Sequence, residues 1–153
     1  MDKQALYAAC MTYVQQRIDT ATEAMQAAQE AANSESKSSA GDKYETGRAM
    51  AQLERDRHAQ LLAEAQRLKQ DLEHLDLGTS AETARAGSVV VTARTDGRPG
   101  TFFLAISAGR LVVEGQDYMA VSVASPIGAL LRGRRVGDAV TFNKATYVIK
   151  QIY

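Results

Sequence analysis

Two carboxylates, Asp42 and Glu45, are the side chains in this sequence whose type and spacing are best suited to chemistry. Near the start of a helix, residues three apart lie on neighbouring sides of one turn. Such a pair can jointly approach Mg²⁺, which prefers oxygen ligands and usually takes only one or two protein carboxylates. The same spacing also suits a helix N-terminus, with Asp42 as the N-cap and Glu45 at the third position. The two interpretations are compatible, and both stay open.

Two long helices are predicted to position this pair. The segment from Lys3 to about Ala32 contains no Gly or Pro and consists mainly of good helix formers. A polar, turn-rich stretch from Asn33 to Gly41 follows, and a second helix is expected from about Asp42 to Leu75. Because the helices are similar in length and the loop is short, they should form an antiparallel hairpin with its tip at 33–45.

The periodicity of apolar residues indicates which faces of the two helices meet. Spacings that alternate between four and three are typical of helices packed lengthwise. On the first helix the expected seam consists of Val14, Ile18, Ala21, Met25, Ala28 and Ala32. On the second it consists of Met50, Leu53, Leu61, Ala65, Leu68, Leu72 and Leu75, interrupted by the polar Arg57 and His58. A two-helix rod buries little by itself, so its base is expected to pack on the C-terminal part of the chain.

The second half of the chain has a different composition. Ala dominates the apolar residues before Leu77, whereas Val, Ile and Phe dominate after Gly87, which favours strands. Expected strands are Ser88–Ala93, Thr101–Ser107, Arg110–Val113, Met119–Val123, Ala139–Phe142 and Thr146–Ile152. A short helix is expected over 125–133, with Pro126 in its first turn. The predicted fold class is α+β, with an antiparallel helical hairpin (coiled coil) over 1–77, a linker over 78–87 and a small antiparallel β domain over 88–153.

Composition limits the function classes. Eighteen basic residues balance eighteen acidic ones, so any contact with DNA or RNA must run through a partner or a local patch. The single cysteine, Cys10, excludes an intramolecular disulfide and is expected to be a small packed apolar residue. No stretch has the ~20 apolar residues of a membrane span, and the start does not resemble a signal peptide. We therefore expect a cytoplasmic monomer with no membrane partner.

The stretch from Ser122 to Val140 resembles the C-terminal signature of the Gre transcript-cleavage factors. It contains a Ser125-Pro126-Ile127 turn, a short helix ending in glycine, then Val136-Gly137-Asp138 and a strand. The last residues, 147–153, are similar to the closing strand of that family. With the hairpin in front, the resemblance covers essentially the whole chain.

The hairpin tip carries a further part of the resemblance. The family has a glycine-aspartate pair with a glutamate three residues after the aspartate, and Gly41, Asp42 and Glu45 reproduce that spacing. The match ends there, because 46–49 read Thr-Gly-Arg-Ala where the family usually has asparagine, alanine, glutamate and tyrosine.

The resemblance implies a fold and an activity. The C-terminal domain would be FKBP-like and would dock on bacterial RNA polymerase beside the secondary channel, through Ser125, Pro126, Ile127 and Gly128. The hairpin would enter the channel, where Asp42 and Glu45 would be the catalytic acids that help hold a Mg²⁺ shared with the polymerase. The polymerase would then cleave the 3′ end of a backtracked transcript. The chain would touch nascent RNA only indirectly, have no cofactor of its own and not be an independent enzyme.

Other functions remain open. Because the tip match ends at Glu45, a polymerase-binding regulator or inhibitor with the same fold but no cleavage activity is the main alternative. A peptidyl-prolyl isomerase would need an aromatic-lined pocket, and the β domain has few aromatic residues and no Trp. Cys10, in a helix seam, is a poor start for nucleophilic chemistry. A plain coiled-coil adaptor is the remaining possibility.

Overall fold

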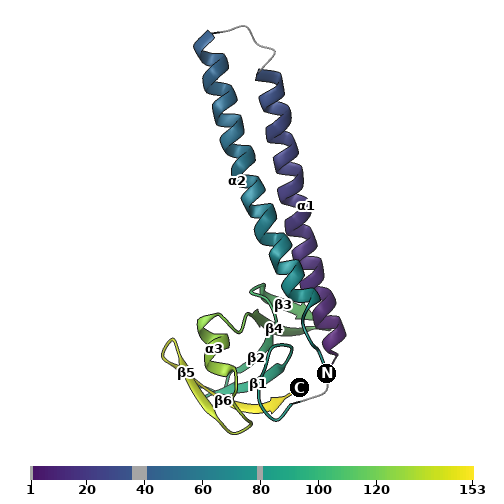
Figure 1. Ribbon diagram of the computed structural model, residues 1–153. Helices are drawn as coiled ribbons and strands as arrows, with labels where there is room; N and C mark the ends of the chain where they lie inside the picture. The colour runs from purple at the N-terminus through teal and green to yellow at the C-terminus, as the bar shows by residue number, and fades with distance from the viewer. Residues whose placement is uncertain (1, 36–40, 79–80) are drawn as a thin grey trace. The chain divides into compact units, whose positions relative to one another are not determined.

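The computed structural model describes residues 2–35, 41–78 and 81–153. Two helices of 33 residues each, α1 (Lys3–Glu35) and α2 (Gly41–Glu73), run side by side as an antiparallel hairpin (Figure 1). At 1.5 Å per residue each helix is about 50 Å long. The backbone N–H groups of Gln4 and Ala5 donate to Oδ1 of Asp2, which therefore caps the start of α1. The predicted hairpin is confirmed. No helix in the described ranges is long and apolar enough to cross a membrane.

The chain divides into two compact units. The shaft unit comprises Tyr13–Lys69, and the base unit combines Met1–Thr12 with Gln70–Tyr153. The first turns of α1 and the last turn of α2 thus belong with the β domain rather than with the rest of the hairpin.

Small residues line the α1 side of the shaft. Val14, Ala21 and Ala32 are buried, and Ile18, Met25 and Ala28 are half-buried, as the spacing of four and three predicts. Small side chains let two helices approach closely while burying little surface, so packing within the shaft contributes little stability per turn.

The seam predicted for the upper half of α2 is wrong. Met50, Leu53 and Leu61 are 57%, 64% and 47% exposed. The partly or fully buried positions follow the same spacing on a neighbouring stripe, which consists of Ala51, Arg55, His58, Leu62, Ala65, Lys69 and Leu72.

The physical reason is that long polar side chains occupy part of this seam. Nη1 of Arg55 donates to Oε1 of Gln29 on α1 at 3.2 Å, which ties the two helices together. Polar residues with apolar stems can cover a helix interface while their polar ends reach solvent or each other. His58 lies on this stripe, whereas Arg57 is exposed.

The β domain is a six-stranded sheet with the order β3-β4-β2-β1-β6-β5. Its strands are β1 (Val89–Arg94), β2 (Pro99–Leu104), β3 (Gly109–Val113), β4 (Gln116–Val121), β5 (Ala139–Phe142) and β6 (Ala145–Ile152). One short helix, α3 (Pro126–Leu131), follows β4. Each element lies within a few residues of its predicted position. Two-residue turns at 114–115 and 143–144 have positive φ at both residues, as tight hairpins between twisted strands require.

The sheet is mixed, so the prediction of a purely antiparallel sheet is wrong at one pairing. β2 and β4 are parallel, with Phe102 opposite Met119. β3 takes the edge position, and its tight turn leads β4 back into the place beside β2. β4 lies between β3 and β2, runs antiparallel to β3 and is therefore parallel to β2.

Both faces of the central strands are buried. On one face Val90, Phe102 and Leu104 form a core with Ile127 and Leu131 of α3. Side chains alternate between faces along a strand, so Val89 and Phe103 point to the opposite face, and they are also fully buried.

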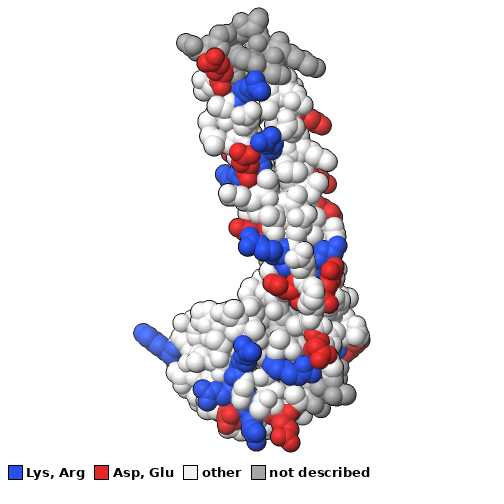
Figure 2. Space-filling model, viewed as in Figure 1, with Lys and Arg blue, Asp and Glu red and all other residues white. Residues whose placement is uncertain are grey.

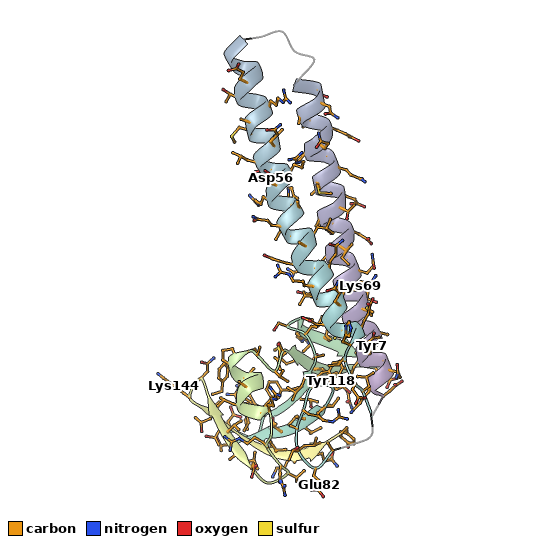
Figure 3. The ribbon with its side chains drawn as sticks, viewed as in Figure 1. Tyr7, Asp56, Lys69, Glu82, Tyr118 and Lys144 are labelled. Atoms are coloured by element: carbon orange, nitrogen blue, oxygen red, sulfur yellow. The ribbon has the colours of Figure 1, made fainter. Side chains whose placement is uncertain are left out.

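The hairpin supplies further buried residues to the base unit. Leu6 and Cys10 of α1 and Leu72 of α2 are 0–1% exposed and belong to the same compact unit as the sheet. Figure 3 labels one tyrosine from each part of this unit, Tyr7 on α1 and Tyr118 on β4. We infer that the base of the hairpin packs on the face of the sheet that carries Val89 and Phe103.

The segment between the hairpin and β1 is packed on the β domain. Ala84 is 1% exposed, its N–H donates to the carbonyl of Arg134, and its carbonyl accepts from the N–H of Gly133. Gly87 has a φ of +93°, and a Cβ there would collide with the carbonyl of Asp76. The second half of the expected linker is therefore held by backbone hydrogen bonds and a close approach that only glycine permits.

A pair of leucines on α2 tests where the hairpin is stabilised. Leu72→Ala removes a fully buried side chain at the base, and we expect it to lower the free energy of unfolding by about 2–5 kcal/mol. Leu61→Ala, at an exposed position of the same helix, should change it by less than about 0.5 kcal/mol. Urea unfolding followed by circular dichroism measures both. Equal losses for the two variants would contradict the assigned burial.

Candidate functional site

The two acids singled out by the sequence lie in the first two turns of α2. α2 begins at Gly41, so Asp42 is a helical residue just inside the N-terminus rather than the N-cap. The side chain of Asp42 lies outside the described residues, as do residues 36–40; Glu45 is exposed. Because both acids are helical, they keep the spacing that puts them on neighbouring sides of one turn. Their role in metal binding stays a prediction.

The segment from Ser122 to Gly133 is a tightly bonded turn followed by α3. The Oγ of Ser125 accepts from the N–H of Gly128 at 3.1 Å and donates to the carbonyl of Ser122 at 2.6 Å. Ser125 is therefore the N-cap of α3, and Pro126 takes the first helical position, where its missing N–H costs nothing. The local chemistry of Ser and Pro thus fixes where the chain enters the helix.

The next two residues fix α3 against the domain. Ile127 is 8% exposed and packs with Leu104, Val121 and Leu131 in the core. A Cβ on Gly128 would clash with the carbonyl of Ser122, so glycine is required for the approach of α3 to the preceding turn. Ile127→Asp would bury an unpaired carboxylate, so it would unfold the domain instead of reporting on a partner's contact.

The exposed surface of this segment comes from other positions. Pro126, Ala129 and Arg132 are exposed, and Arg134 and Arg135 extend a basic cluster beyond α3. Arg134 Nε donates to the carbonyl of Leu130 at 3.1 Å, which holds that side chain against α3. On the face drawn in Figure 2, basic and acidic side chains are interspersed along the two long helices, so neither sign of charge dominates that face of the hairpin.

A small polar network joins the end of α2 to the first residues of α1. Nζ of Lys3 donates to the carbonyl of Leu77 at 3.1 Å. The N–H of Gly78 donates to the Asp76 carboxylate, and together with the nearby Arg85 guanidinium it lowers the pKa of that carboxyl. Burial and the Arg85 charge lower the pKa of Lys3, and Asp76 opposes that change.

The remaining titratable candidates have no arrangement typical of catalysis. Burial raises the pKa of the Cys10 thiol to about 11, which leaves little of the nucleophilic thiolate at neutral pH. His58 Nε2 lies 3.5 Å from Glu54 one turn earlier, and His74 Nδ1 is 2.7 Å from the carbonyl of Gln70. Within the described ranges, no group of three or more His, Cys, Asp or Glu side chains is placed to hold a metal ion.

Sequence reasoning missed Arg85 and the pairing of residues 83–84 with 133–135. Neither has a periodic or turn signal. The pairing joins segments about 50 residues apart, and Arg85 meets Asp76 of the turn that follows α2. Arg85 lies two residues before Gly87, whose required positive φ was the only available hint.

Comparisons with known proteins give matches among solved structures only. No model of a protein family matches the chain, and the search of curated proteins gives no match. The chain is similar to GreA factor homolog 1 (Gfh1) of Thermus thermophilus, with 23% identity, a TM-score of 0.38 and 92% of each chain covered. A structure of the transcription factor Gfh1 gives 23% identity and a TM-score of 0.38, covering 96% of this chain and 92% of that chain. Gfh1 of Thermus aquaticus gives 27% identity and a TM-score of 0.37, covering 98% of this chain and 95% of that chain.

The cap of α3 can be tested separately from any partner. Ser125→Ala removes the acceptor for the Gly128 N–H and the donor to the Ser122 carbonyl, and should cost about 0.5–2 kcal/mol of stability. Ala129→Ser, at an exposed position of the same helix, should change stability by less than about 0.5 kcal/mol. Urea unfolding of the two variants checks this. Unchanged stability in Ser125→Ala would exclude the capping role.

Proposed function

We propose that this chain is a Gre-type transcription factor that binds RNA polymerase, places its hairpin in the secondary channel and stimulates cleavage of backtracked transcripts. The observation that carries the proposal is the pairing of two features in one chain. A long hairpin presents Asp42 and Glu45 at the start of its second helix, and the following β domain contains the family-like Ser125–Gly128 motif.

The structural roles of the motif residues support the proposal. Ser125 caps α3, Pro126 starts it, Ile127 anchors it in the core and Gly128 permits its close approach. The four residues together build one turn and the start of one helix. This shared structural role is a physical reason for them to occur together. The exposed surface of the motif, around Pro126 and Ala129, is the part available for docking on the polymerase.

The donor set at the tip fits a metal that is held mainly by the partner. Two carboxylates three residues apart on a helix provide too few ligands to bind Mg²⁺ tightly alone. When bound between hairpin and polymerase, the ion would stabilise the attacking and leaving oxygens of phosphodiester cleavage. Asp42 and Glu45 would contribute oxygen ligands and orient the water, and the polymerase would supply the remaining groups.

The second candidate is a channel-binding regulator without cleavage activity. It is favoured by the residues after Glu45, where Arg48 puts a positive charge one turn from the proposed metal ligand. A cation near the site opposes binding of a second cation.

The proposal predicts a separation of stability from activity at the tip. Asp42→Asn and Glu45→Gln remove the charges that a metal ligand needs. At a helix N-terminus each change should cost no more than about 1 kcal/mol of stability. Stimulated cleavage should nevertheless fall at least tenfold in each. The measurement is cleavage of the labelled transcript in a stalled, backtracked complex with polymerase from the same organism.

Matched controls lie lower on the same helix. Asp56→Asn and Glu64→Gln remove exposed carboxylates from the shaft (Asp56 is labelled in Figure 3) and should leave cleavage unchanged. A parent protein that competes with a cleavage factor for polymerase but never stimulates cleavage would establish the regulator instead. A parent that does not bind polymerase would rule out both.

A further inference from the structure

A pocket of about 570 Å³ lies within the base unit. It is lined by the end of α2, the segment before β1, the residues that directly follow β4 and the residue that follows α3. Its polar lining consists of Asp71, His74, Asp76, Arg85, Ser122 and Arg132. This volume falls in the range of ~300–1,000 Å³ that is usual for small-molecule sites. The lining includes neither the hairpin tip nor Ser125–Gly128, although Arg132 lies at the end of the same short helix, α3.

Some of these polar groups are already engaged. Arg85 Nη1 lies 3.4 Å from Oδ2 of Asp76, so these two charges largely neutralise each other. The 2.7 Å contact of His74 Nδ1 with the Gln70 carbonyl requires a proton on Nδ1, since a carbonyl only accepts. In the neutral ring, Nε2 is then an acceptor for a ligand's proton.

Other groups in the lining retain hydrogen-bonding capacity. Arg132 uses its backbone N–H to cap the end of α3, but its guanidinium has no hydrogen bond or ion pair to any residue that the structure describes. The Ser122 hydroxyl accepts from the N–H of Ala124, which leaves its proton for another acceptor. An uncompensated guanidinium and a hydroxyl donor in one pocket are suited to an oxyanion.

We propose that this pocket binds a small organic anion, with its carboxylate or phosphate group on Arg132 and Ser122. Asp71 and the Nε2 of neutral His74 are acceptors in the same lining, so a ligand that also carries hydroxyl groups fits better than a bare anion. Because Asp76 is paired with Arg85, Asp71 is the acid of the lining that opposes polyanions such as nucleic acid. This binding requires no polymerase, so it stands or falls independently of the proposed function.

The test is a titration of the full-length, ¹⁵N-labelled protein, followed by the amide shifts of Val123, Arg132 and Ala86. The two probes are glycerate, a hydroxy-carboxylate, and glycerol 3-phosphate, a hydroxy-phosphate, at constant ionic strength; glycerol is the neutral control. We expect saturable shifts at these amides with at least one anion. The anion that binds more tightly identifies whether carboxylate or phosphate is the group recognised. Glycerol should produce none.

Matched arginine variants assign the site. Arg132→Gln should weaken binding at least tenfold, and Arg134→Gln, two residues away and bonded to the Leu130 carbonyl, should change it less than twofold. Arg132→Lys keeps the charge but loses the paired N–H donors of the guanidinium. It should therefore give an intermediate loss of affinity, and it provides a second folded variant. Absence of saturable shifts with both anions, equal shifts with glycerol, or equal losses at Arg132 and Arg134 would overturn the proposal.

Discussion

The structure depends on the burial of apolar side chains where the base of the hairpin joins the β domain. Leu6, Cys10 and Leu72 are fully buried there, and Val89 and Phe103 are fully buried on the sheet. A two-helix rod has only one narrow face to bury, and the α1 seam is mostly small residues, so it gains little from its own packing. The base therefore supplies the stability that the shaft lacks, and polar residues such as Arg55 and Gln29 are tolerated between the helices.

The α3 region contains two sets of residues, one that fixes its fold and one that is exposed to solvent. Ser125 and Gly128 have roles set by local geometry, and Ile127 has a role in the core. The close approach at Gly128 requires glycine, whereas an N-cap accepts Ser, Thr, Asp or Asn. Their neighbours Pro126, Ala129 and Arg132 are exposed, so the core places no constraint on these side chains. A resemblance that rests on Ser125, Ile127 and Gly128 is therefore evidence for the fold of this segment. Evidence for its contacts would have to come from the exposed residues.

Much of the fold follows from signals that are local in sequence. The long Gly-free and Pro-free segment, the turn glycines and the β-branched runs place every helix and strand within a few residues. The failures are non-local: which stripe of α2 faces α1, which strand β4 pairs with, and where Arg85 and Ala84 lie. Met50, Leu53 and Leu61 are apolar but exposed. The stripe that faces α1 keeps the alternating spacing of four and three and runs through Arg55 and His58. At the candidate site, the short helix with Pro126 in its first turn follows from the sequence, whereas the proposed docking and metal roles can be observed only with a partner.

The proposed placement of the hairpin in the polymerase channel is tested most directly by photo-crosslinking from position 45 to the RNA of a backtracked complex. A crosslinking residue replaces Glu45, and a control protein carries it at the exposed Arg110 on β3. The proposed function predicts a crosslink from position 45 to the 3′ segment of the transcript and none from position 110, with equal binding of both proteins to the polymerase. Binding without any RNA crosslink from position 45 would contradict insertion of the tip at the active site.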